Sequence, residues 1–285
     1  MNKINLSVLM VLAVLCTDFR ANSQHKSLKI ISYNIFDSFR GDTLVKNLFA
    51  EVITKEQPDI IALQEVKGYS EKSLNDFAKS LGMQYSALQR GKGHSVALIS
   101  KYPISNVKKI TKNMFHGYMY ANILGYHIVV AHLAPFTYME RNKEMDALIA
   151  FLNTLQKEDK VLVMGDLNAM SPADKKDYGT EKIALMKASE ARNAHIRNLN
   201  NGEIDYSAMQ KIIDAGYFDT WRRFNKKFEK SAPTSIKKHN NYTRIDYILA
   251  NKTLKKVCLK AYMIKNELTE KISDHYPQVL ELKIN

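Results

Sequence analysis

The fold is decided by the stretch Val161-Leu162-Val163-Met164-Gly165-Asp166-Leu167-Asn168, in which a continuous apolar run leads directly to an acid and an amide. Uninterrupted Val, Ile and Leu runs of this length are typical of strands buried on both faces of a sheet. An ionised side chain at the end of such a strand cannot face an apolar interior unpaired. The stretch therefore predicts a buried strand that delivers Asp166 and Asn168 to a polar pocket.

Other apolar runs end in the same way. Their polar residues are Asn34 after residues 30–33, Glu65 after 60–64, His132 after 128–131, Asp246 within 244–249, and Asp274-His275 before Tyr276-Pro277. We expect these strand ends to converge on one pocket. Carboxylates, imidazoles and carboxamides without a thiolate suit a hard cation such as Mg²⁺ or Mn²⁺ better than a structural zinc ion. This set of side chains is typical of a hydrolase.

The order of elements predicts the fold class. Amphipathic helices are expected at 43–55, 72–81, 141–155 and 207–215. Strands are expected at 28–33, 59–64, 84–88, 95–100, 107–110, 118–124, 127–132, 160–164, 244–249, 255–264 and 278–283. Strands outnumber helices and come in meander-like groups, which favours mixed sheets over a doubly wound one. We therefore predict an α/β fold, a four-layer α/β/β/α sandwich in which two mixed β-sheets pack face to face with helices outside.

The length and composition favour one domain behind a targeting segment. The chain has 285 residues, 45% of them hydrophobic, and neither a linker nor an internal repeat divides it. The apolar stretch 6–16 is too short to span a bilayer, and small residues at 21 and 23 fit cleavage before Gln24. We predict a signal peptide over 1–23, a single catalytic domain over 24–285, and export to the periplasm, the cell surface or the medium.

The two cysteines bear on this prediction. Cys16 raises the alternative of a lipoprotein anchored at that residue, which is disfavoured because Leu15 is a poor match before a lipidated cysteine. A buried helix is a further alternative for the same stretch. Removal of the signal peptide would leave Cys258 alone, so that no intramolecular disulfide could form. Cys258 lies between Val257 and Leu259, and is interpreted as an unreactive strand residue.

The charge is strongly positive and local. The formal net charge is +13, and residues 222–271 contain fourteen Lys or Arg against four Asp or Glu. A basic field concentrates polyanions such as nucleic acids, or anionic membrane surfaces. The alternative, a solubilising surface, has equal weight because lysine dominates and aromatic residues are not interleaved.

Seven ordered motifs give a specific resemblance. They are Ser32-Tyr33-Asn34, Leu63-Gln64-Glu65-Val66, Val96-Ala97-Leu98-Ile99-Ser100-Lys101-Tyr102-Pro103-Ile104, Ala131-His132-Leu133, Gly165-Asp166-Leu167-Asn168-Ala169, Arg244-Ile245-Asp246-Tyr247-Ile248-Leu249 and Ser273-Asp274-His275-Tyr276-Pro277. In this order they resemble the endonuclease/exonuclease/phosphatase superfamily of DNase I-like, metal-dependent phosphohydrolases. The resemblance covers about residues 28–284.

The resemblance implies a role for each matched residue. Glu65 would be the principal metal carboxylate, with Asn34 and Asp274 beside it, and the cofactor would be Mg²⁺ or Mn²⁺. Asp166 would orient or deprotonate the attacking water. The remaining roles are His275 facing the scissile phosphate, Asp246 fixing the tautomer of His275, His132 donating to a phosphate oxygen, and Asn168 holding the water or the phosphate, with Asn34 also near the substrate. Whether Asp166 or the histidine pair is the base stays open, as does the choice between one and two ions.

Each motif alone has a structural interpretation. Residues 165–168 could be a turn, His132 a core histidine, Asp246 an ion-pair partner of Arg244, and 274–277 a strand-entry turn. Their joint occurrence at strand ends favours catalysis. The following residues are interpreted as surface, loop or core-edge residues: His94, His116, His127, His195, His239 and Trp221.

The substrate is left open between phosphoesters. The leading hypothesis is a nuclease-like phosphodiesterase that acts by in-line attack of water, with nucleic acid as substrate. The alternative is a phosphatase or phospholipase C/sphingomyelinase-like hydrolase of a lipid headgroup or a sugar phosphate, and a catalytically silent anion-binding module is a third reading. No stable protein partner is expected, and a monomer is predicted. The loops 171–203 and 222–243 are expected to set the choice.

Overall fold

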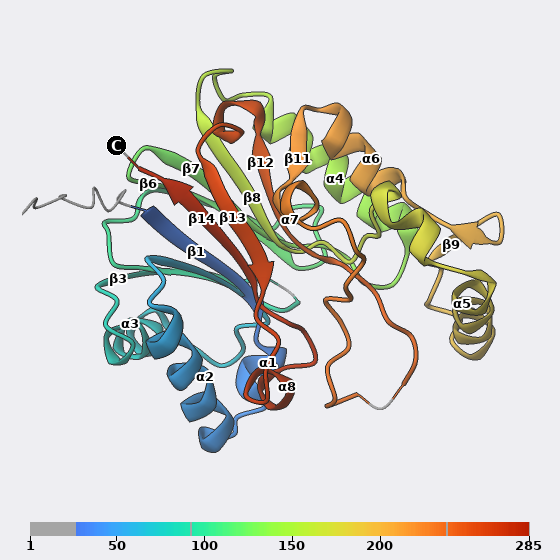
Figure 1. Cartoon of the computed structure of the whole chain (residues 1–285), viewed down its shortest axis with the longest axis horizontal. Helices are drawn as coiled ribbons and strands as arrows, with labels where there is room; N and C mark the ends of the chain where they lie inside the picture. The colour runs from blue at the N-terminus through green and yellow to red at the C-terminus, as the bar shows by residue number, and fades with distance from the viewer. Residues whose placement is uncertain (1–26, 92, 238, 285) are drawn as a thin grey trace, which may run out of the picture.

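The computed structural model describes residues 27–91, 93–237 and 239–284. Its core is two six-stranded mixed sheets (Figure 1). The first has the order β13 (Cys258–Met263), β14 (Gln278–Lys283), β1 (Ser27–Asn34), β2 (Ile60–Gln64), β4 (Val96–Ser100) and β3 (Tyr85–Gln89). The second has the order β11 (Tyr217–Asp219), β12 (Asp246–Asn251), β8 (Lys160–Asp166), β7 (Tyr126–His132), β6 (Gly117–Ile123) and β5 (Ser105–Ile110).

Each six-stranded sheet contains one parallel pair at its centre. β1 runs parallel to β2, and β7 runs parallel to β8, whereas the other neighbours are antiparallel. A hydrogen bond between Asn34 at the end of β1 and Asp166 at the end of β8 places the carboxyl ends of both pairs at one end of the sandwich. A small hairpin-like pair, β9 (Leu199–Asn200) and β10 (Glu203–Ile204), stands apart from both sheets.

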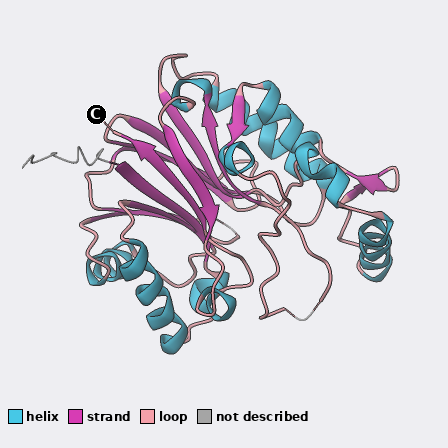
Figure 2. Cartoon of the chain, viewed as in Figure 1, coloured by secondary structure: helices cyan, strands magenta, loops and turns pink. Residues whose placement is uncertain are grey.

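Helices cover the two outer faces (Figure 2). The first sheet packs against α2 (Thr43–Glu56), α3 (Glu71–Ser80) and α8 (Thr269–Ile272). The second packs against α4 (Tyr138–Leu152) and α6 (Ser207–Asp214), and α7 (Thr220–Phe224) packs on β12 and β13. The remaining helical segments are α1 (Phe36–Phe39), the 3₁₀ turns Pro172–Asp177 and Lys252–Leu254, and α5 (Thr180–Arg192).

Three apolar clusters hold these layers together. The cluster between the sheets includes Ile30 and Leu98 from one sheet and Val130, Met164 and Ile248 from the other, all fully or nearly fully buried. The two other clusters lie between a sheet and its helices. Alternate side chains of one strand thus face different layers, as expected for strands buried on both faces. The predicted four-layer α/β/β/α sandwich is confirmed.

The predicted elements agree with the structure to within a few residues, and the segment 171–203 contains a helix that the sequence did not indicate. The helix α6 ends just before Gly216, which has φ +97°. Among the described residues, no helix combines the length and apolarity needed to cross a membrane. The predicted signal peptide over 1–23 and Cys16 lie outside the described residues.

Candidate active site

Strand pairing brings the predicted residues to one end of the sandwich. Asn34 ends β1 opposite Gln64, the residue before Glu65. His132 ends β7 opposite Asp166, which is also paired with Asp246 at the start of β12. The last residues of two parallel pairs therefore meet where an antiparallel strand begins. Residues that follow apolar runs in the sequence therefore surround one pocket in the structure.

Asn34 links the two central carboxylates. Its Nδ2 donates to Glu65 Oε1 and to Asp166 Oδ2, both at 3.1 Å. Its Oδ1 accepts the Phe36 backbone N–H at 3.0 Å. The amide nitrogen thus holds carboxylates from both sheets, while the amide oxygen is engaged by backbone. Asn34 acts in this structure as a positioning residue, and its role as a metal ligand stays a prediction.

A left-handed turn fixes Glu65. Residues 36–40 all have φ between +44° and +63°, which costs L-residues free energy, and Glu65 itself has φ +60°. The turn gives the Asp37 N–H to Glu65 Oε2 at 2.9 Å and the Ser38 N–H to the Glu65 carbonyl oxygen at 2.9 Å. These hydrogen bonds compensate for the strained backbone by holding the carboxylate. Glu65 therefore has one oxygen on Asn34 and the other on the turn.

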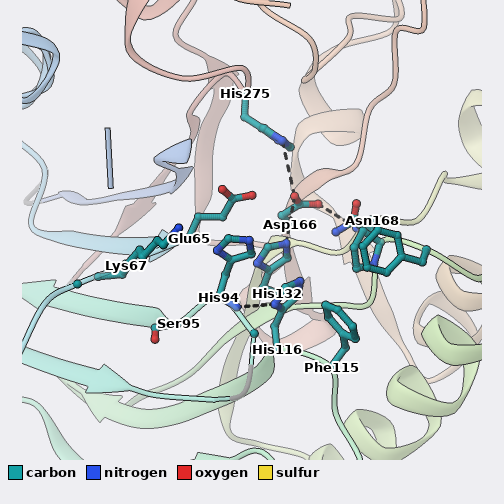
Figure 3. Close-up of a pocket in the computed structure, with 15 residues that line it drawn as sticks. Glu65, Lys67, His94, Ser95, Phe115, His116, His132, Asp166, Asn168 and His275 are labelled. Carbon is teal, nitrogen blue, oxygen red and sulfur yellow. Dashed lines mark hydrogen bonds and ion pairs between the residues drawn. The ribbon is translucent and has the colours of Figure 1, made fainter. Parts of the chain in front are cut away.

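His275 forms the predicted pair with Asp246. Its Nδ1 lies 2.8 Å from Asp246 Oδ2, and its backbone N–H donates to Ser273 Oγ at 3.1 Å. The opposite ring nitrogen, Nε2, faces Asp166 Oδ2 at 3.7 Å (Figure 3). Burial alone would disfavour the charged imidazole, but Asp246 and Asp166 outweigh it and raise the pKa of His275 well above its ordinary value.

Asp166 is the central carboxylate. Its Oδ1 accepts the Asn168 N–H at 3.0 Å, and its Oδ2 lies 3.6 Å from His132 Nε2. Burial, opposed by His275 and reinforced by Asp246, raises the pKa of Asp166 to about 7. A carboxylate with a pKa near neutrality can accept a proton at physiological pH.

The backbone around Asp166 requires glycine. Gly165 has φ +141°, and a Cβ there would lie 1.9 Å from the Ala131 carbonyl oxygen of the neighbouring strand. Asn168 follows with φ +49°, and its Nδ2 donates to the Leu133 carbonyl oxygen at 3.0 Å. The chain thus turns sharply at the end of β8, between the side chains of Asp166 and Asn168.

Three histidines stack beside Asp166, and two of them were not predicted as site residues. The rings of His116 and His132 lie 3.9 Å apart, inclined by 15°, and His94 lies 6.1 Å from His132. His116 Nδ1 accepts the His94 backbone N–H at 2.7 Å. Burial and the neighbouring imidazoles lower the pKa of His132, and burial lowers that of His116 to about 3. His116 and His132 are therefore neutral at physiological pH.

His94 and His116 lie in loops, as interpreted, but the interpretation as surface residues does not hold for His116 and misses their place in the pocket. Both line the pocket, and His116 is buried. Their partners lie on different strands and loops, so the sequence carries no spacing that could indicate the stack. The weak signal available was the density of histidines, with His94, His116 and His132 each flanking an apolar run.

Asp274 lies at the edge of this group. Its Oδ1 is 4.0 Å from His275 Nε2, and its Oδ2 is 3.8 Å from Lys237 Nζ. The same Oδ1 is buried without a hydrogen-bond partner among the described residues. An orphaned carboxylate oxygen beside His275 is a site where a cation would be stabilised.

Arg244 does not pair with Asp246, contrary to the structural interpretation of that motif. Its guanidinium is fully buried; Nη2 is ion-paired with Asp174 Oδ2 at 2.7 Å, Nη1 is ion-paired with Asp219 Oδ2 at 2.6 Å, and Nε donates to Asp174 Oδ2 at 2.8 Å. It also lies 5.0 Å from the centre of the Trp221 ring, which is buried. Asp246 is thereby left free for His275.

The pocket is an open cleft of about 540 Å³. Figure 3 shows Glu65, Asp166, Asn168 and His275 around it. Lys67 lies on one side, and Phe115 lies on another. A volume of this size falls in the range of about 300–1,000 Å³ found for small-molecule sites.

The chain also matches a family model. The model described as the Endonuclease/Exonuclease/phosphatase family matches residues 31–275. The chain belongs to the endonuclease/exonuclease/phosphatase family. Members of this family hydrolyse phosphoester bonds with the help of a divalent metal ion, and the chain is a hydrolase of that class.

Individual proteins show the same relationship. Exodeoxyribonuclease III of Haemophilus influenzae is 26% identical over 293 residues, covering 90% of this chain and 100% of that protein. An AP endonuclease structure from Archaeoglobus fulgidus has a TM-score of 0.69 at 20% identity. A Neisseria 3′ phosphatase bound to a product DNA hairpin has a TM-score of 0.70 at 17% identity. Each of the two matches covers 90% of this chain and 100% of the other chain. The two structures show the fold.

The side chains present fit a divalent ion. Ligand atoms of Asp37, Glu65 and His94 lie within 4.8 Å of one another, as do those of Asp166, Asp246 and His275. The second group is already bonded internally through the His275–Asp246 pair, so Glu65 is the better anchor. Together with the orphaned Asp274 oxygen, the oxygen-rich set suits a hard cation.

Proposed function

We propose that this protein is an exported, Mg²⁺-dependent phosphodiesterase that cleaves nucleic-acid backbones by in-line attack of water on phosphorus. The observation that carries the proposal is the position of Asp166 in the cleft. Its Oδ2 faces Asn34, His132 and His275. A base and a cationic donor that line the same cleft are what hydrolysis of a phosphodiester needs.

The chain's own groups divide the work. Asp166, with its pKa raised to about 7, takes the proton of the attacking water. Asp246 accepts a hydrogen bond from His275 Nδ1–H and so directs Nε2–H at the phosphate. There the positively charged ring stabilises the negative charge that develops in the transition state. When bound, the divalent ion would supply charge neutralisation on a nonbridging phosphate oxygen. Glu65 and Asp274 would hold it.

The substrate assignment draws on charge. Lys237, from the basic segment 222–271, lies 3.8 Å from Asp274 and 4.5 Å from the centre of the Phe36 ring, at the rim of the site. A basic rim favours a polyanion through backbone phosphate contacts. The exodeoxyribonuclease relative and the DNA-bound phosphatase structure support a nucleic-acid substrate.

The test is a substrate panel. We expect DNA hydrolysis with Mg²⁺ or Mn²⁺ and none with chelator. Faster hydrolysis of sphingomyelin or sugar phosphates than of DNA would replace the nuclease with a phospholipase C-like enzyme or a phosphatase. Binding of DNA without turnover of any member of the panel would indicate a silent anion-binding module. Export is proposed from residues 1–23 alone, and a mature N-terminus at Gln24 in the extracytoplasmic fraction is the expected result.

A further inference from the structure

A second, smaller cavity adjoins the catalytic cleft. Its volume is about 110 Å³, and its lining shares Asn168 and Pro135 with the cleft. The other walls come from α4, from α5 and from residues 241–245. In Figure 1, α5 stands at the margin of the molecule, away from the two sheets. We refer to this cavity as the side pocket.

Two buried cations line the side pocket. Lys182 on α5 is 2% exposed, and Arg141 on α4 is 5% exposed. The Lys182 ammonium donates to Asn241 Oδ1 and, at 2.9 Å, to the Tyr242 carbonyl oxygen. Arg141 Nη1 donates to the carbonyl oxygens of Ala134 and Pro135 at 3.1 and 3.3 Å. All these acceptors are neutral.

Neither cation has a counter-ion among the described residues. The ion pairs within 4.0 Å include neither Lys182 nor Arg141. Burial lowers the pKa of Lys182 to about 8 and, despite nearby carboxylates, that of Arg141 to about 10. A buried charge without a partner is costly, so an anion entering the side pocket would regain much of that cost.

The acid in the lining is already occupied. Asp205 Oδ1 accepts from Ser207 and Asn142, and its Oδ2 accepts from Asn200 Nδ2 at 3.1 Å. Asn198, another lining residue, has a buried Oδ1 without a partner, while its Nδ2 donates to Pro135 at 3.3 Å. Two cations thus face one saturated carboxylate across the side pocket.

We propose that the side pocket binds a terminal phosphate of the substrate while the scissile phosphodiester lies in the adjoining cleft at Asn168. The inference rests on the proposed function and makes the enzyme one that acts at phosphorylated ends. Size supports a small group, because 110 Å³ is well below the roughly 300–1,000 Å³ of pockets that hold whole small molecules. The chemistry is that of a phosphate monoester held by buried cations.

A purely structural role for Lys182 makes a different prediction. Its ammonium lies 5.9 and 6.0 Å from the ring centres of Tyr178 and Tyr242, and so ties α5 to the 241–242 segment. Loss of that tie alone would lower the stability of the protein, and it would affect the hydrolysis of every substrate to the same extent. Loss of an anion site would change the preference between two substrates that differ in one terminal phosphate.

The experiment measures hydrolysis of three dinucleotides, with a 5′-phosphate, with a 3′-phosphate and with neither. We expect one phosphorylated dinucleotide to be preferred through a lower KM, and Lys182→Met to reduce that preference by about 10- to 100-fold, the range for a hydrogen bond to a charged group. Lys182→Arg should restore it. Lys187→Met, on the exposed face of α5, is the matched control and should keep the preference. Equal use of all three dinucleotides by the wild type would overturn the proposal.

A second variant and a binding measurement keep the test independent of folding and turnover. Asn198→Asp adds a negative charge to the lining and should abolish the preference even if Lys182→Met does not fold. In chelator, inorganic phosphate should raise the Tm of the wild type and of Lys187→Met, but not that of Asn198→Asp. An equal rise in all three proteins would overturn the side pocket. A wild type that hydrolyses nothing, yet shows the selective rise, would refute the proposed function and retain the side pocket.

Discussion

His275 Nδ1 lies 2.8 Å from Asp246 Oδ2, which leaves His275 Nε2 directed at Asp166. This pair joins the loop that leads into β14 to the start of β12, and so bridges the two sheets at the cleft. The carboxylate fixes both the tautomer and the ring orientation. Catalysis should therefore depend on Asp246, although Asp246 does not line the cleft.

Asp246→Asn tests this dependence. The amide keeps the shape but loses the negative charge that stabilises the His275 cation, and it can present a donor where the carboxylate only accepts, so kcat should fall by about 10²–10⁴. KM should change little, because Asp246 is behind His275. Steady-state kinetics on bis-p-nitrophenyl phosphate measures both constants, and a variant with unchanged kcat would remove Asp246 from the mechanism.

Gly165→Ala should disrupt the site through the backbone. The added methyl group would lie 1.9 Å from the Ala131 carbonyl oxygen at a φ of +141°, so strands β7 and β8 must separate. A loss of about 3 kcal/mol or more in the free energy of unfolding is expected. Gly125→Ala is the control, since Gly125 also has positive φ but an added Cβ there has open space. Equal losses in urea titrations would contradict the assigned clash.

Arg244→Met should destabilise the protein by about 3–5 kcal/mol, because Asp174 and Asp219 would be left buried without their cation. Arg222 still donates to Asp174 Oδ1, which should limit the loss at that carboxylate. Urea unfolding of the variant measures the effect. A change below about 1 kcal/mol would show that the network is not buried as described.

Acid should unfold the protein partly through His116. The pKa of His116 is lowered from 6.5 to about 3 in the folded state, so its stabilising contribution is full above pH 6.5 and is lost as pH falls toward 3. Between pH 7 and 5 this amounts to about 2 kcal/mol. His116→Phe should flatten the stability profile over that range by this amount. An unchanged slope would place the acid sensitivity elsewhere.

The sequence was sufficient for the sheets, except for the short edge strand β11, and for most of the cleft. The apolar runs ending at Asn34, His132 and Asp166 predicted buried strands. Parallel pairing aligns the ends of these strands and so brings their polar residues together. The helix α5 was not predicted because residues 171–203 are polar and show no clear apolar face. The left-handed turn 36–40 was not predicted because non-glycine residues visit positive φ only singly, Asp more often than Phe or Ser, and a run of five is not indicated by the sequence.

Other site features depend on tertiary contacts. His94 and His116 meet through a hydrogen bond between residues 22 positions apart. Arg244 is next but one to Asp246 in the sequence, yet pairs with Asp174 and Asp219, far away along the chain. Such pairings are decided by packing between layers, which local patterns do not record.

The most direct test of the account is the metal-dependent hydrolysis of bis-p-nitrophenyl phosphate by Asp166→Asn. The variant should retain the wild-type circular dichroism spectrum, since an amide can occupy the same space beside Asn34 and Asn168. Its kcat should fall by about 10²–10⁴, because the group that accepts the proton of water is gone. A folded Asp166→Asn protein with wild-type kcat would contradict the proposed catalytic centre.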